Sequence, residues 1–333
     1  MALFINCSGS SSVSIGTYAL TSSNGNYNTS VGTSSLFSNT TASENTAVGY
    51  QSMYTNTTGQ YNTALGHTSL RGNTTASGNT ALGYGSMYTN TTGAYNTAVG
   101  GADSNGTGPL FANTTGAFNI AMGNGALRSN TTATNNTAIG YAAGYNTTTG
   151  SSNVFLGGQS GYSNTTGINN LYLGKDAGYF ATGSGNVALG ALNSSGTYAP
   201  IFAFTSENDR VALGTTSVTN AYIQVAWTVV SDARDKTNIA DIPHGLEFVS
   251  QLQPKQYQFK KSREDDTPNG NIRYGFLAQD ILELEGDTPV IIDNEKPDHL
   301  KYNGESLVPV LVKAIQELKA EVDSLKQQLN NGV

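Results

Sequence analysis

Residues 45–61 read NTAVGYQSMYTNTTGQY, and residues 62–78 repeat this unit closely as NTALGHTSLRGNTTASG. The pentad Asn-Thr-Ala-apolar-Gly, with close variants, starts ten times between Asn28 and Asn186. Seven of the nine steps between successive starts are 17 residues, one is 23 and one is 16. A fixed short period indicates a solenoid, and 17 residues are too few for a pair of helices. The sequence therefore predicts a mostly β protein with a β-solenoid shaft.

Two apolar columns accompany this period. Within Thr46-Ala47-Val48 the first and third side chains share one face of a strand, and the middle one takes the other face. The third position is apolar in all ten copies. We therefore expect these large side chains to stack in a narrow core, with the small middle residues facing a closely approaching surface. The second column lies eight residues after the asparagine, at Leu36, Met53, Leu70, Met87 and Leu127, and later copies have Gly-Tyr there.

Asparagine also recurs before Thr-Thr, as at Asn39, Asn56 and Asn73, which predicts stacked side-chain amide ladders. Composition alone also permits a disordered Gly/Asn/Thr/Ser tract, but strict spacing and filled apolar columns favour the solenoid. Each coil offers only two or three apolar side chains. We therefore expect parallel chains to share buried surface around a symmetry axis.

The repeats resemble the heads of trimeric adhesins and the shafts of bacteriophage tail fibres, over about residues 14–214. The 23-residue step is one coil with six extra residues between Gly101 and Phe111. The candidate receptor-binding loop within it is Asp103, Ser104 and Asn105, although such insertions are more often simply tolerated. Aromatic residues either stack on sugar rings or, as we prefer, pack along the shaft. They are Tyr50, Tyr84, Tyr141, Tyr61, Tyr95 and Phe118.

The density of charge changes abruptly along the chain. Residues 1–230 carry 5 acidic and 4 basic side chains, whereas residues 231–333 carry 18 and 12. Such a shift marks a boundary between domains with different roles. We expect an N-terminal segment over 1–13, the shaft over 14–196 and a β neck over 197–230, with an apolar strand at Tyr222–Val230. The C-terminal domain then spans 231–333.

The first residues of this domain, Ser231-Asp232-Ala233-Arg234-Asp235-Lys236-Thr237-Asn238-Ile239, carry a close resemblance. They resemble the opening Ser-Asp-x-Arg-x-Lys-x-x-Ile of the endosialidase-type intramolecular chaperone domain. Three later segments resemble the same family: 252–260, the Gly-Phe-Leu-Ala-Gln of 275–279, and 307–318. Asp235 departs from the apolar residue that is commoner there. The resemblance implies an α+β domain that assists trimerisation of the preceding part. The domain then cuts itself off between Val230 and Ser231, with Ser231 and Lys236 as the catalytic dyad.

Physical chemistry agrees with that assignment. A serine hydroxyl is a poor nucleophile until a base takes its proton, and a neutral lysine can be that base. Desolvation favours the neutral amine. A spacing of five residues places Ser231 and Lys236 on different faces of a helix or strand, so a bend or a neighbouring subunit has to bring them together. Taken alone, the same heptapeptide also fits a solvated charged turn.

Elsewhere in the domain we expect a helix over 246–252 and strands at 257–261 and 273–277, joined by a polar loop over 262–271. A helix at 279–284 and strands at 290–292 and 300–302 follow. The last helix, over about 306–330, starts after Asn303-Gly304, with Pro309 in its first turn. It carries the apolar seam of a coiled coil, for which shaft symmetry suggests three strands. The seam residues are Leu311, Ile315, Leu318, Val322, Leu325 and Leu329.

Several classes of function are disfavoured. The net charge of −7 argues against binding to nucleic acid, and no apolar window suits membrane insertion or a signal peptide. Cys7 is the only cysteine, so no intrachain disulfide forms. No metal site or cofactor is expected, because His67, His244 and His299 are scattered.

We therefore expect a phage tail fibre in the virion, assembled in the host cytoplasm. Its partners would be two copies of itself, other tail proteins and a host cell-surface glycan. A trimeric cell-surface adhesin is one alternative, and a glycan-depolymerising tailspike is another. Most glycosidases need two neighbouring carboxylates. Residues 1–230 offer only Glu44, Asp103, Asp176, Glu207 and Asp209.

Overall fold

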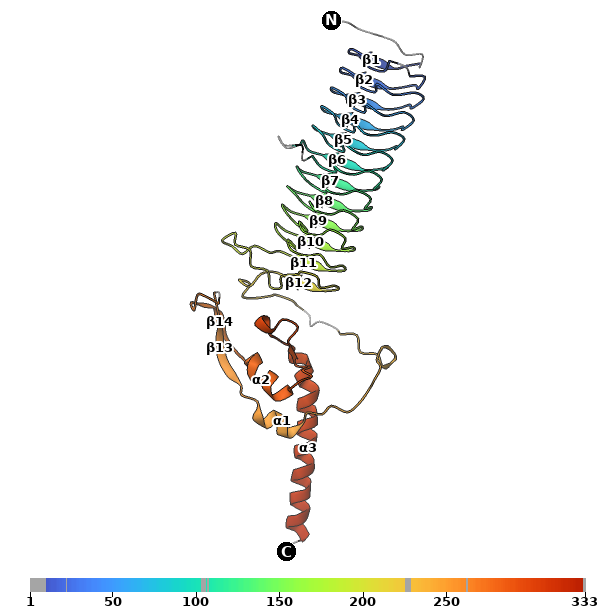
Figure 1. Ribbon diagram of the computed structural model, residues 1–333. Helices are drawn as coiled ribbons and strands as arrows, with labels where there is room; N and C mark the ends of the chain where they lie inside the picture. The colour runs from blue at the N-terminus through green and yellow to red at the C-terminus, as the bar shows by residue number, and fades with distance from the viewer. Residues whose placement is uncertain are drawn as a thin grey trace. The chain divides into compact units, whose positions relative to one another are not determined.

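The computed structural model describes residues 10–21, 23–102, 106, 108–224, 229–261 and 263–331. They form two compact units, which meet in the chain between Val218 and Thr219 (Figure 1). Cys7, most of the expected N-terminal segment and the loop Asp103–Asn105 lie outside the described residues. The boundary expected at Val230 and Ser231 stays a prediction.

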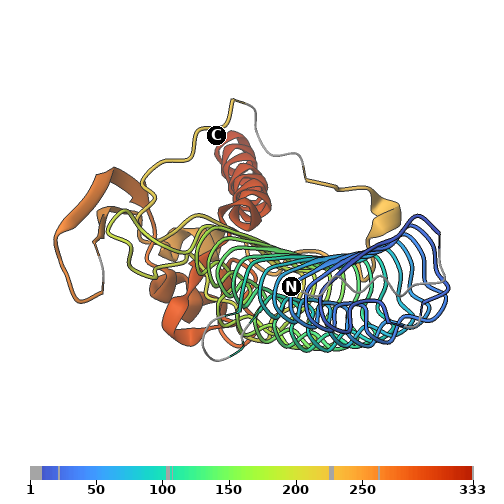
Figure 2. The ribbon, with the colours of Figure 1, turned by 90° about the horizontal axis from the view of Figure 1, so that it is seen from above.

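The first unit is a β-solenoid of parallel three-residue strands, whose order in the sheet follows the chain. Each coil therefore adds one strand beside the last, and Figure 2 shows the coils lying over one another. The register pairs like with like, so Ala47 lies beside Ala64. This architecture confirms the predicted fold. The strands are β1 (Val13–Ile15), β2 (Thr29–Val31), β3 (Thr46–Val48), β4 (Thr63–Leu65), β5 (Thr80–Leu82), β6 (Thr97–Val99), β7 (Ile120–Met122), β8 (Thr137–Ile139), β9 (Val154–Leu156), β10 (Leu171–Leu173), β11 (Val187–Leu189) and β12 (Val211–Leu213).

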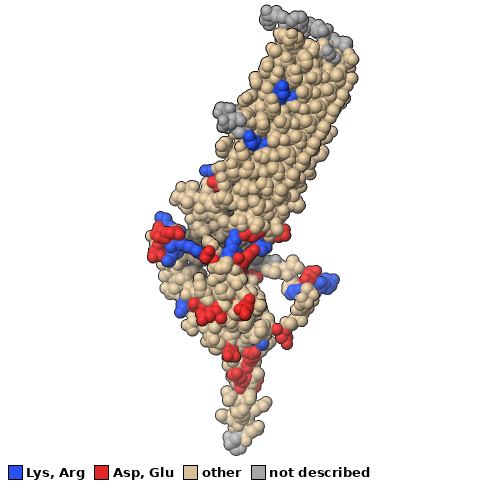
Figure 3. Space-filling view, viewed as in Figure 1, with Lys and Arg blue, Asp and Glu red and all other residues tan. Residues whose placement is uncertain are grey.

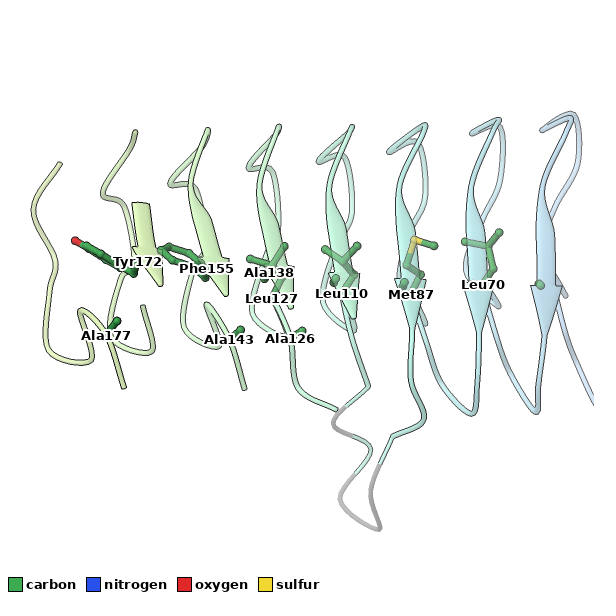
Figure 4. Close-up of a cluster of buried hydrophobic side chains, with 14 of the residues drawn as sticks. Leu70, Met87, Leu110, Ala126, Leu127, Ala138, Ala143, Phe155, Tyr172 and Ala177 are labelled. Atoms are coloured by element: carbon green, nitrogen blue, oxygen red, sulfur yellow. The ribbon is translucent and has the colours of Figure 1, made fainter. Parts of the chain in front are cut away.

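The core of the shaft lies on the opposite side of the strands from the one expected. The middle residues Ala47 and Ala64 are fully buried, whereas the third-position residues Leu65 and Ile139 are 50% and 41% exposed. The second apolar column supplies the large core side chains, several of which Figure 4 shows beside the strands. A small column facing a large one fills a thin coil completely. The predicted orientation of the first column is therefore wrong, and that column forms an outer face.

Later coils exchange the large and small positions. Phe155 and Tyr172 replace alanine at the middle of β9 and β10 and are fully buried. In the same coils Gly161 and Gly178 stand where earlier coils have leucine or methionine. A Cβ at either glycine would lie 2.4 Å from a ring carbon of Phe155 or Tyr172. The Gly-Tyr pairs thus make room for rings that enter the core from the strand.

The glycine that ends the Asn-Thr-Ala-apolar-Gly pentad lies where neighbouring coils approach closely. Gly49 has a φ of +136°, a conformation that residues with a side chain rarely adopt. A Cβ there would lie 2.3 Å from the carbonyl oxygen of Gly66 in the next coil. Glycine is therefore required both by the backbone angle and by the close approach.

Buried asparagines form the predicted ladders through the shaft. The Asn73 side chain donates to Asn56 Oδ1 (2.8 Å) and to the Ala76 carbonyl (2.9 Å), and it accepts from Asn90 Nδ2 (3.0 Å). A second ladder runs through the asparagines that precede the strands, where Asn45 Oδ1 accepts from the Asn62 backbone N–H (3.0 Å). These bonds satisfy buried polar groups that would otherwise destabilise the thin core.

Alanine at position 73 should lower the free energy of unfolding of the shaft by about 3 kcal/mol, because three buried groups lose a partner. Urea unfolding followed by circular dichroism measures this change as a shift of the midpoint. Asn124→Ala is the matched control, because the exposed Asn124 side chain donates one bond, to the Gly101 carbonyl (3.0 Å). Equal midpoints for the two variants would contradict a stabilising role for the ladder.

The second unit is a small α+β fold. Its core is formed by Phe248, Ile281, Ile291, Ile292, Leu307 and Val310. Strands β13 and β14 form an antiparallel pair, and so do β15 and β16. The buried Glu285 carboxylate at the end of α2 accepts the backbone N–H groups of residues 290, 291 and 292 at 2.7–3.0 Å, which fixes the chain before β15. The elements are the 3₁₀ turn η1 (Ala233–Asp235), α1 (Leu246–Gln251), β13 (Lys255–Lys260), β14 (Pro268–Gly275), α2 (Ala278–Glu285), β15 (Ile292–Asp293), the 3₁₀ turn η2 (Pro297–His299), β16 (Lys301–Tyr302) and α3 (Gly304–Asn331).

Three expectations for the C-terminal part are corrected. β14 begins at Pro268, inside the segment expected to be a polar loop. α3 begins at Gly304, so Pro309 lies in its second turn, where it removes one hydrogen bond close to the helix start. Residues 222–224 and 229–230 form no strand, and Tyr222 is 94% exposed; residues 225–228 of the expected strand lie outside the described residues.

Candidate functional site

A tight turn follows the expected cleavage point. Asp232 precedes η1 as its N-cap, and its carboxylate accepts the Arg234 backbone N–H at 2.9 Å. The Asp235 and Lys236 N–H groups donate to the carbonyls of Asp232 (3.1 Å) and Ala233 (3.2 Å). The chain therefore reverses over Ala233–Asp235 and continues as extended backbone at Lys236.

This turn brings together the two residues expected to form the dyad. Lys236 Nζ donates to Ser231 Oγ at 2.7 Å. Five residues apart, the two side chains would point apart on a regular helix or strand, and η1 is the bend that overcomes this spacing. The distance is short enough for a proton to pass between the two atoms when the amine is neutral.

An ion pair between Arg234 and Asp232 also stabilises the turn. Arg234 Nη2 lies 2.6 Å from Asp232 Oδ2, and Arg234 Nε donates to Asp232 Oδ1 at 3.1 Å. These bonds from the Arg234 side chain and backbone lower the pKa of Asp232 below its usual value, and the Asp232 carboxylate raises the pKa of Arg234. We did not anticipate either residue in this role. An aspartate at the N-cap of a turn was the available signal.

The site is open to water in the single chain. All described residues from 229 to 240 are exposed, and Val230 is 80% exposed. The Val230–Ser231 bond is therefore accessible, but the dry surroundings that favour a neutral lysine are not supplied by this segment itself.

The helix α3 anchors the chain that follows the turn. Glu317 Oε2 accepts the Leu246 backbone N–H at the start of α1 (2.6 Å), and Lys313 Nζ donates to the Ile242 carbonyl (2.6 Å). A Cβ at Gly245 would lie 2.2 Å from Glu317 Oε2, so any larger residue there would displace the Glu317 carboxylate. The position of residues 242–246 thus depends on the same helix that carries the apolar seam.

In the shaft, four of the six aromatic residues make ring contacts along its length, whereas Tyr61 and Tyr141 are 60% and 64% exposed. His67 lies between Tyr50 and Tyr84, with ring centroids 5.0 and 5.2 Å apart, and Tyr95 stacks on Phe118 at 5.3 Å. The candidate loop Asp103, Ser104 and Asn105 lies outside the described residues.

Of the two carboxylates expected near each other at the end of the shaft, Glu207 is hydrogen-bonded within its own turn. Glu207 accepts the backbone N–H of Thr205 (2.6 Å) and the Thr205 hydroxyl. Within the described residues, no group of three or more His, Cys, Asp or Glu side chains is placed to hold a metal ion. No helix in the described ranges is long and apolar enough to span a membrane.

Comparison with known proteins finds a match in the C-terminal part. Residues 231–287 match the family model described as the chaperone of endosialidase, and the match begins at Ser231. No curated protein and no solved structure matches the chain. A chaperone-of-endosialidase domain behind a β-solenoid shaft fits a phage tail fibre or tailspike-type protein.

Proposed function

We propose that the protein is a trimeric phage tail fibre whose shaft contacts the host surface. Its C-terminal domain assists trimerisation and then releases itself by cleavage between Val230 and Ser231. The observation that carries this proposal is the 2.7 Å contact between Lys236 Nζ and Ser231 Oγ, at the first residue of the matched domain. A serine and a lysine in contact can supply the nucleophile and base of a self-cleaving peptidase.

The outer face of the shaft supports the homotrimer. Its strands present a continuous row of apolar third-position residues, and parallel in-register pairing makes this row straight. Contact between equivalent rows of three chains would remove apolar surface that one chain leaves in water. The row is Ile15, Val31, Val48, Leu65, Leu82, Val99, Met122, Ile139, Leu156, Leu173, Leu189 and Leu213.

The helix α3 offers a second surface of this kind. Leu307, Val310 and Ala314 pack on the domain core, whereas the six expected seam residues from Leu311 to Leu329 are exposed by 36–77%. An apolar seam with alternating steps of four and three suits a parallel coiled coil. Three α3 helices wound together would hold the C-terminal ends of three chains in register, which is what a trimerisation chaperone has to do.

The cleavage consumes one water molecule per chain. Ser231 Oγ attacks the Val230 carbonyl carbon, while its proton passes to Lys236 Nζ and then to the departing Ser231 nitrogen. This step exchanges the peptide bond for an ester. Water then hydrolyses the ester, which leaves a Val230 carboxylate and restores the Ser231 hydroxyl. Because Lys236 is exposed in the single chain, we infer that trimer assembly supplies the dehydration that makes it a base.

Expression of residues 1–333 followed by intact mass spectrometry and analytical ultracentrifugation tests the proposal. The expected products are fragments 1–230 and 231–333, with 1–230 sedimenting as a trimer. A stable full-length monomer would overturn it. Incubation of the purified shaft with host polysaccharide, followed by end-group analysis, separates a binding fibre from a depolymerising tailspike.

Asn at position 232 should slow self-cleavage by about fivefold, because an amide still caps η1 but loses the ion pair to Arg234. The rate is measured as the appearance of fragment 231–333 on denaturing gels after a temperature shift that starts assembly. Asp235→Asn removes the same charge from the same turn without touching the cap, and it should cut at the wild-type rate. Equal cleavage rates for the two variants would show that the ion pair between Asp232 and Arg234 has no role in cleavage.

A further inference from the structure

One column of the shaft is a ladder of aromatic rings interrupted by two arginines. It consists of the residue that follows the second apolar column in each coil, and its members are half-buried. Neighbouring rings stack face to face, for example Phe37 on Tyr54 at 5.1 Å and Tyr162 on Tyr179 at 5.0 Å. The members in order are Phe37, Tyr54, Arg71, Tyr88, Phe111, Arg128, Tyr145, Tyr162 and Tyr179.

Each arginine takes the place of a ring and stacks between two rings. The Arg71 guanidinium carbon lies 5.2 Å from the Tyr54 ring centroid and 5.5 Å from that of Tyr88. The Arg128 guanidinium lies 5.9 Å from the Phe111 ring and 5.4 Å from the Tyr145 ring. Both guanidinium faces are therefore covered, which leaves the in-plane N–H groups for other partners.

Hydrogen bonding is incomplete at one of the two positions. Arg71 Nε donates to Gln51 Oε1 at 3.1 Å. Arg128 Nε is buried and has no acceptor among the described residues. A ring at position 128 would continue the ladder without a buried N–H group, so packing alone does not explain why arginine stands there.

The two positive charges stand in an almost uncharged shaft. Between residues 10 and 174, the sequence has Arg71 and Arg128 as its only Lys or Arg, and Glu44 and Asp103 as its only acidic residues. No ion pair involves either arginine within the described ranges, and Asp103 lies outside them. Figure 3 shows that the viewed surface of the shaft is nearly free of charge, whereas charged side chains gather on the C-terminal unit.

We propose that Arg71 and Arg128 form a binding stripe for an anionic polysaccharide that bears carboxylates. The two side chains are three coils apart in one column, which places them about 14 Å apart along the shaft. Two fixed cations at this separation suit an extended polymer with repeated charges better than a single small anion. In-plane guanidinium N–H groups bind carboxylates with charge assistance. The inference adds a ligand class to the proposed shaft function and does not depend on self-cleavage.

The experiment compares protein expressed as the full chain, wild type and the double variant Arg71→Tyr/Arg128→Tyr, by surface plasmon resonance at low ionic strength. Tyrosine continues the ladder, so the variant removes the cations and keeps the packing. The probes are immobilised alginate, glycerol teichoic acid and neutral dextran. Lys175→Gln/Arg210→Gln is the charge-matched control near the C-terminal end of the shaft. Circular dichroism and sedimentation confirm that all forms fold and assemble alike.

We expect wild type and the control to bind alginate, and the ladder variant to bind at least tenfold more weakly. Added NaCl should weaken wild-type binding, because the contacts are ionic. Alginate binding that is absent from wild type, or equal in wild type and the ladder variant, would overturn the proposal. Binding to dextran alone, or to teichoic acid without alginate, would overturn the carboxylate assignment. These outcomes do not depend on whether residues 231–333 are cut from the chain.

Discussion

Alanine at position 231 should leave every chain at the full mass of residues 1–333, with no fragment 1–230 or 231–333. Ser231 Oγ is the atom that Lys236 Nζ contacts at 2.7 Å, and without it no ester with Val230 can form. Loss of the nucleophile slows serine hydrolases by about 10⁴–10⁶-fold, so no product should accumulate over days. Intact mass spectrometry of protein sampled over several days measures this directly. Ser250→Ala, at an exposed serine on α1, should cut normally.

The lysine variants separate the base from a merely structural partner. Lys236→Ala should block cutting as Ser231→Ala does. Lys236→Arg keeps the charge and the donors but cannot become a neutral base, so it should also stay uncut. Lys255→Ala, at an exposed lysine on β13, is the matched control and should cut like wild type. Efficient cutting by Lys236→Arg would exclude proton transfer through this residue.

Mixed trimers test whether one chain supplies both groups. The structure brings Ser231 and Lys236 of the same chain into contact through η1. We therefore expect that co-expressed Ser231→Ala and Lys236→Ala chains do not restore cutting in each other. Appearance of fragment 231–333 from such mixtures would mean that the working dyad forms between neighbouring chains.

The architecture of the shaft was predictable because its period and its glycines are local requirements. The backbone angle at position 49 and the close approach to Gly66 both require glycine, and the same two constraints recur at Gly32 and Gly140. The inward face of the strands was not predictable in the same way. Either side of Thr46-Ala47-Val48 is compatible with a three-residue strand, and the choice depends on Met53, which fills the core from another part of the coil. Volume complementarity between distant columns decides the orientation.

The candidate site was predictable in its residues but not in its geometry. The motif identifies Ser231 and Lys236 as a pair, but its five-residue spacing does not show how they meet. The two residues meet through the turn η1, which the Asp232 carboxylate stabilises by capping it and by pairing with Arg234. These contacts form between side chains within one turn, and the periodicity of the sequence does not reveal them. Both residues are exposed in the single chain. Their surroundings in an assembly depend on neighbouring chains, which the sequence of one chain does not describe.

Aspartate at both Leu65 and Ile139 should abolish the trimer and leave the fold of each coil intact. These side chains are half exposed on the outer face of β4 and β8, and the core lies behind them at Ala64 and Ala138. If three such faces meet around an axis, the double variant would bury six unpaired carboxylates, at a cost of several kcal/mol for each. Sedimentation velocity should therefore change from trimer to monomer, while circular dichroism keeps its β signal.

The matched control places the same charges on another part of the same shaft. Tyr61→Asp/Tyr141→Asp removes two aromatic side chains that are 60% and 64% exposed, and aspartate tolerates the positive φ of 58° at position 61. This variant should remain trimeric, because neither residue lies on a strand. If it dissociated and Leu65→Asp/Ile139→Asp did not, the chains would meet through the aromatic side of the coil. The apolar row would then have to face water, a cost that only a different partner along its length would offset.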